Sequence, residues 1–110
     1  MSDFETIARK NHRDGKNCAI SVYEAFGDVN ANKTKAPAPR AEGGKCGAVL
    51  AAVQVIREMG GSVDKIEAFE SRFQEEYGSL KCSELRGFLN NKCNDYVGTA
   101  AAMTGEMVEV

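Results

Sequence analysis

The chain has 110 residues, and its 14 lysines and arginines against 16 aspartates and glutamates give a formal net charge of −2. This length suits one domain, residues 1–110, with a hydrophobic core of its own. Nucleic-acid binding is not expected, because the sequence lacks a dense basic patch with exposed aromatic residues. No run of about 18 uncharged apolar residues predicts a membrane span, and the polar N-terminus is unlike a signal peptide, so we expect a cytoplasmic protein.

The first half of the chain predicts one clear helix. Residues 1–16 form a polar segment with only a short periodic piece. From about Asn17 to Phe26, apolar residues recur at three- and four-residue steps, with Asn17 as a plausible N-cap and Gly27 as a natural stop. Residues 28–45 contain both prolines, and we expect a flexible loop that could cover the cysteines.

The second half of the chain predicts four further helices. Residues 46–59 are apolar almost all round, which is typical of a buried central helix. Residues 62–77 form an amphipathic helix capped by Ser62, and a short helix at 82–88 and a last helix at 93–108 follow. Because strand-like alternation is absent, we predict an all-α fold, a compact bundle of four to five helices.

The four cysteines are the most informative feature of the chain. Each opens a predicted helix, and they are Cys18, Cys46, Cys82 and Cys93. A thiol at a helix N-terminus lies at the positive end of the backbone dipole, which favours the thiolate. We therefore predict that all four converge at one end of the bundle as a catalytic, redox-active thiol site. The alternative is that they are small apolar residues of the core.

Two sulfur chemistries fit four cysteines. In a redox site, one thiolate attacks a disulfide or an oxidant and a second cysteine resolves the mixed species. The partner would be an unidentified redox protein or a small thiol or disulfide, and no cofactor is expected. In a metal site, Cys18, Cys46, Cys82 and Cys93 would hold zinc or an iron–sulfur cluster. The usual Cys-x-x-Cys pattern of metal sites is absent, which favours the redox site.

Individual roles can be predicted within the redox site. Cys46 follows a glycine pair and begins the buried helix, so it is the predicted attacking thiol. Cys82 and Cys93 are the closest pair in the sequence and form the predicted disulfide.

His12, in a polar and basic stretch, is predicted to be an ordinary surface residue. A bundle this small, with two methionines near its end, could form a homodimer.

Four stretches around the cysteines match a known pattern. They are Asn17–Ala19, Gly43–Ala51, Phe73–Gly87 and Cys93–Val97. Together they resemble the C_GCAxxG_C_C family, although in the second stretch Gly47 follows Cys46 and Ala51 replaces a later glycine. The resemblance implies a bacterial or archaeal origin, an all-α fold and a redox role for the four cysteines, without an established substrate.

Overall fold

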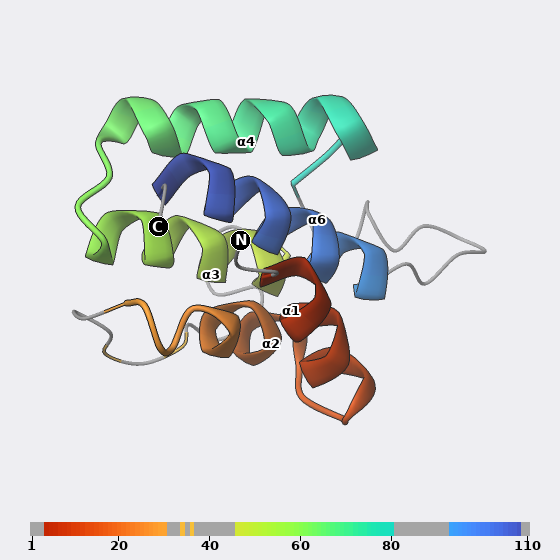
Figure 1. Ribbon diagram of the computed structural model, residues 1–110. Coiled ribbons are helices and arrows are strands. Elements are labelled where there is room, and N and C mark those ends of the chain that lie inside the picture. Colours follow the sequence, from red (N-terminus) through yellow and green to blue (C-terminus); the bar gives the residue numbers. More distant parts are fainter. Residues whose placement is uncertain (1–3, 31–33, 35, 37–45, 81–92, 109–110) are drawn as a thin grey trace.

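Figure 1 shows a computed structural model that describes residues 4–30, 34, 36, 46–80 and 93–108. The helices in these ranges are α1 (Phe4–Arg13), α2 (Cys18–Ala25), α3 (Gly47–Glu58), α4 (Val63–Tyr77) and α6 (Cys93–Val108). The same ranges contain no strand, so the prediction of an all-α bundle of four to five helices is confirmed. The short helix predicted at 82–88 lies outside the described residues. None of the described helices is long and apolar enough to cross a membrane.

Helix α3 is the buried centre of the bundle, as its apolar sequence predicts. It contacts α2, α4 and α6. In Figure 1, α4 runs along one side of the α3 and α6 pair, and α2 runs along the other. The buried side chains of α3 are Ala48, Val49, Leu50, Ala51, Ala52, Val55 and Ile56. Because the first turns of α3 include Gly47 and three alanines, a neighbouring helix can approach closely at these positions.

Helix α1 occupies most of the segment 1–16, where the sequence predicted a polar stretch without a helix. Only Phe4 and Ala8 of this helix are buried. The Phe4 ring stacks on Phe26 with a centroid distance of 4.1 Å, and a Cβ added at Gly105 of α6 would lie 2.8 Å from the Phe4 ring. Tertiary packing therefore stabilises α1, because only these two of its ten side chains are buried and a short isolated helix is marginal in water.

Helix α4 ends in a turn that reaches the start of α3. At its beginning, the Ser62 side chain caps a backbone N–H of the first turn, as predicted. At its end, Gly78 has a φ of 86°, in the left-handed region that favours glycine. Two residues later, the carbonyl of Leu80 accepts a 2.8 Å hydrogen bond from the Cys46 N–H. The chain after α4 is thus fastened to the residue that precedes α3.

Candidate cysteine site

Cys18 is the first residue of α2 and is half-buried. The preceding Asn17 has an extended backbone, and its side-chain oxygen accepts a 2.8 Å hydrogen bond from the Ile20 N–H. This N-cap determines where the helix begins. Cys18 therefore lies at the N-terminus of α2, where the unpaired backbone N–H groups form the positive end of the helix dipole. The helix start predicted at Asn17 and Cys18 is confirmed.

Cys46 is the N-cap residue of α3 and is buried, with 3% of its surface exposed. Its carbonyl accepts a 3.0 Å hydrogen bond from the Leu50 N–H, the first bond of the helix. Its own N–H donates to Leu80, so the backbone of Cys46 is held on both sides. The side chain makes no capping hydrogen bond. A thiolate at this position would lie at the positive end of the α3 dipole, where the first N–H groups have no partner within the helix.

Gly47 brings the starts of α2 and α3 into contact. A Cβ added at this position would lie 3.0 Å from the Ala19 nitrogen and 3.4 Å from the Cys18 Cβ. The Cys18 Cβ is therefore within about 5 Å of the Gly47 Cα, since one carbon–carbon bond separates Cα from Cβ. Because Cys46 directly precedes Gly47, the structure places two of the four predicted cysteines on neighbouring first turns.

The other two cysteines are described only in part. Cys93 is the first residue of α6, so its predicted helix start is confirmed, but its side chain lies outside the described part of the chain. Cys82 lies outside it altogether. The convergence of all four cysteines and the Cys82–Cys93 disulfide therefore remain predictions.

The metal alternative also remains a prediction, because it needs all four cysteines. Of the four, the described side chains are Cys18 and Cys46, and both are thiols. Within the described ranges, no three histidine, cysteine or acidic side chains form a group that could hold a metal ion. A zinc or iron–sulfur site would thus depend on the thiols of Cys82 and Cys93.

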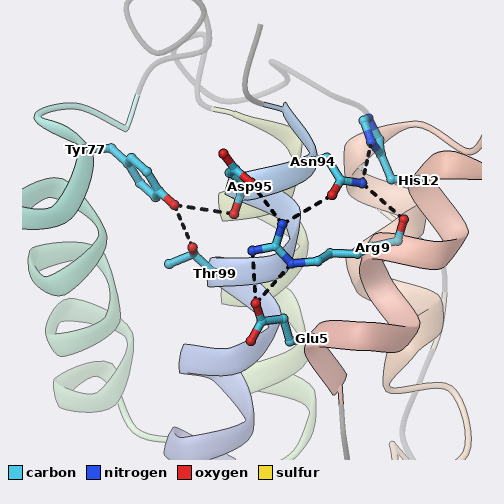
Figure 2. Close-up of polar contacts among 7 residues, drawn as sticks. All are labelled: Glu5, Arg9, His12, Tyr77, Asn94, Asp95 and Thr99. Atoms are coloured by element: carbon cyan, nitrogen blue, oxygen red, sulfur yellow. Dashed lines mark hydrogen bonds and ion pairs between the residues drawn. The ribbon is translucent and has the colours of Figure 1, made fainter. Parts of the chain in front are cut away.

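The first turn of α6 is tied to α1 by polar contacts (Figure 2). The Arg9 guanidinium forms ion pairs with Glu5 at 2.9 Å and with Asp95 at 3.0 Å. Arg9 Nη1 also donates a 3.2 Å hydrogen bond to Asn94 Oδ1. Partial burial alone would lower the pKa of Arg9, but the hydrogen bonds to Asp95 and Glu5 raise it above its usual value. Arg9 is therefore a permanent cation beside the start of α6.

His12 and Tyr77 approach the same end of α6 from two neighbouring helices (Figure 2). Asn94 Nδ2 donates a 3.1 Å hydrogen bond to the Arg9 carbonyl and lies 3.3 Å from His12 Nδ1. The Tyr77 hydroxyl shares a 2.6 Å hydrogen bond with the Thr99 hydroxyl. His12 is half-buried instead of lying freely on the surface, and this burial lowers its pKa. No sequence signal marked the contact, because its two residues are 82 positions apart.

A second polar cluster surrounds Glu58, at the end of α3 opposite Cys46. Its carboxylate accepts hydrogen bonds of 2.7 to 2.9 Å from Tyr23, Asn30, Thr34 and Gln54. Burial alone would raise the pKa of Glu58, but these hydrogen bonds hold it below its usual value. Asn30 and Thr34 belong to the segment 28–45, so Glu58 fastens part of the predicted loop to α3. This role was not apparent from the sequence.

Comparison with known proteins identifies a family. A family model described as "Putative redox-active protein (C_GCAxxG_C_C)" matches residues 16–107. No curated protein and no solved structure matches the chain. The matched range includes all four cysteines and runs from just before α2 almost to the end of α6. Because the match covers far more than half of the residues, the chain belongs to the C_GCAxxG_C_C family.

Proposed function

We propose that this protein carries out thiol–disulfide exchange at the cysteines that begin α2 and α3. The observation that carries the proposal is the close approach of Gly47 to Cys18 and Ala19, which puts Cys18 and Cys46 on neighbouring first turns. The redox activity ascribed to the family agrees with this chemistry. Two positive helix ends at one place also favour the thiolate, the reactive form of cysteine.

In this proposal Cys18 is the thiol that a substrate reaches first. Cys18 is half-buried, whereas Cys46 is almost completely buried. Attack on a disulfide requires access to the attacking sulfur. Cys46 was the attacking thiol predicted from the helix pattern, and its burial favours instead the role of the internal, resolving thiol.

The proposed reaction transfers two electrons. The Cys18 thiolate attacks one sulfur of a substrate disulfide, a mixed disulfide forms, and the other substrate sulfur leaves as a thiolate. The Cys46 thiolate then attacks the Cys18 sulfur, which forms the Cys18–Cys46 disulfide and releases the second substrate thiolate. The protein loses two electrons and the substrate gains them, while the two protons lost by the cysteines are taken up by the departing thiolates.

Cys82 and Cys93 extend the proposal to a second pair. The Cys46 N–H is bonded to the carbonyl of Leu80, which precedes Cys82 by two residues in the sequence. Cys93 begins α6, which packs against both α2 and α3. We therefore propose that Cys82 and Cys93 form a second disulfide, which exchanges with the Cys18–Cys46 pair. The substrate is a disulfide of a partner protein or of a small molecule.

Two matched serine variants test the order of attack. Cys46→Ser keeps the first thiol and lacks the resolving one, so it should accumulate a mixed disulfide at Cys18 when treated with oxidised glutathione. Cys18→Ser should accumulate far less adduct at Cys46. In the wild-type protein, mild oxidation should produce a Cys18–Cys46 disulfide in peptide maps.

Two results would contradict the proposal. The first is equal adduct formation at the remaining thiol of both variants, and the second is oxidised wild-type protein without a Cys18–Cys46 disulfide. Metal analysis of protein purified without oxygen completes the experiment. Stoichiometric zinc or iron with protected thiols would support the four-cysteine metal site in place of the redox site.

A further inference from the structure

Helix α1 contacts the chain on both sides of Cys18. Asn11 Nδ2 donates a 3.2 Å hydrogen bond to the carbonyl of Ser21, in the first turn of α2. The Asn11 carbonyl accepts a 3.2 Å hydrogen bond from the N–H of Lys16, two residues before the helix. One residue of α1 therefore holds the two backbone positions that flank the beginning of α2.

The same half of α1 also holds the first turn of α6. Asn94 directly follows Cys93, and both ends of its amide are bonded to Arg9 (Figure 2). Its oxygen accepts from the Arg9 guanidinium at 3.2 Å, and its nitrogen donates to the Arg9 carbonyl at 3.1 Å. Asp95 adds an ion pair of 3.0 Å to the same guanidinium. The residues that follow Cys93 are thus bonded to one arginine of α1.

Gly98 leaves room for this contact. A Cβ at Gly98 would collide with the Arg9 guanidinium. Glycine weakens the interior of a helix. In α6, Gly98 leaves the space that the Arg9 side chain occupies. Helix ends open locally unless tertiary contacts hold them. Contacts from Arg9 and Asn11 therefore oppose such opening at two helix starts, and each of these helices begins with a cysteine.

We propose that the second half of α1 is a brace, in which Asn11 holds the start of α2 and the Arg9–Asn94 pair holds the start of α6. This inference rests on the proposed function, because its consequence is to keep Cys18 and Cys93 in position for disulfide exchange. Arg9, Asn11 and Asn94 are positioning residues, and they act through the first turns to which they are bonded. His12 supports the same end of the brace through Asn94.

Alkylation rates of the individual cysteines in the reduced, folded protein test the brace. Asn94→Ala should raise the rate at Cys93 by about tenfold, because it removes more than one hydrogen bond from that turn. The rates at Cys18 and Cys46 should stay within about twofold of wild type. Asn11→Ala should show the opposite selectivity: the alkylation rate at Cys18 should rise, and the rate at Cys93 should not change.

A double-mutant cycle separates positioning from general loosening. Arg9→Ala should raise the Cys93 rate as Asn94→Ala does, and the combined effect in the double variant should be smaller than the product of the two single effects, because both substitutions remove the Arg9 Nη1–Asn94 Oδ1 hydrogen bond. Arg72→Ala is the control, since it breaks an ion pair of 2.9 Å between α4 and Glu106 near the other end of α6. It should leave the Cys93 rate unchanged.

Three results would overturn the brace. They are an unchanged Cys93 rate in both Arg9→Ala and Asn94→Ala, an equal rise at Cys18, Cys46 and Cys93, and an equal effect of the control. If Asn94→Ala does not fold, His12→Ala replaces it, because it removes one side-chain contact of the same amide. Alkylation needs no redox substrate, so selective rates without disulfide exchange would support the brace and refute the proposed function.

Discussion

Replacing Gly47 with alanine tests the contact on which the cysteine site depends. The added Cβ would lie 3.0 Å from the Ala19 nitrogen, 3.3 Å from the Ala19 Cβ and 3.4 Å from the Cys18 Cβ. The nearest atom is backbone, so α2 must move as a unit, and α1 and α6 pack on its other sides. Such overpacking costs about 1–3 kcal/mol, while alanine favours a helix over glycine by up to about 1 kcal/mol. We therefore expect the free energy of unfolding to fall by about 1–2 kcal/mol.

Urea unfolding of the reduced protein measures this loss, and peptide mapping after mild oxidation measures its consequence at the site. A disulfide tolerates little change in Cβ separation, so the yield of Cys18–Cys46 disulfide should fall together with stability. Gly105→Ala is the control, because its Cβ would meet the Phe4 ring at 2.8 Å, and Phe4 stacks on Phe26 at the end of α2 opposite Cys18. It should lower stability and leave the disulfide yield unchanged. Wild-type stability and disulfide yield in Gly47→Ala would refute the reasoning.

Two further predictions concern the polar clusters. Glu58→Ala should lower the free energy of unfolding by about 1–3 kcal/mol, because two buried residues, Tyr23 and Asn30, each lose the carboxylate that accepts their hydrogen bond. Urea unfolding measures this loss, and an unchanged midpoint would contradict it. The folded pKa of Glu58 is below its usual value, so its stabilisation is complete above about pH 4.5 and is lost as the pH falls through the folded pKa. Glu58→Gln should flatten that acid limb. His12 responds at higher pH: burial lowers its folded pKa, so the unfolded chain binds more protons and stability falls as the pH drops below 6.5. His12→Gln should remove this slope in urea unfolding across pH 5–8, and an unchanged slope would show that His12 is not its source.

Several helix boundaries could be predicted because their signals are local. The side chains of Asn17 and Ser62 accept hydrogen bonds from N–H groups within three residues, and Gly78 ends α4 in a left-handed conformation. Asparagine, serine and glycine are favoured at such positions because of their own side-chain or backbone chemistry. The apolar run from Gly47 to Ile56 predicted a buried helix in the same direct way.

Helix α1 was missed for a physical reason. Its apolar residues Phe4, Ile7 and Ala8 form only a short periodic piece, and the remainder of the helix is polar and charged. Its stabilising partners lie far along the chain, with Phe4 packed beside Gly105 and Arg9 beside Gly98. Glycines within a helix ordinarily indicate weakness, and only the docked α1 shows that these two make space for neighbouring side chains.

The candidate site also has one part that the sequence predicts and one part that depends on tertiary packing. The sequence by itself determined that Cys18, Cys46 and Cys93 stand at helix starts, because capping residues and apolar periodicity act over a few neighbouring positions. Only the tertiary structure decided which of these starts meet. The contact of Gly47 with Ala19 crosses a long connection, and the bond between Arg9 and Asn94 joins residues 85 positions apart. Such contacts depend on how whole helices pack, and no local propensity encodes that arrangement.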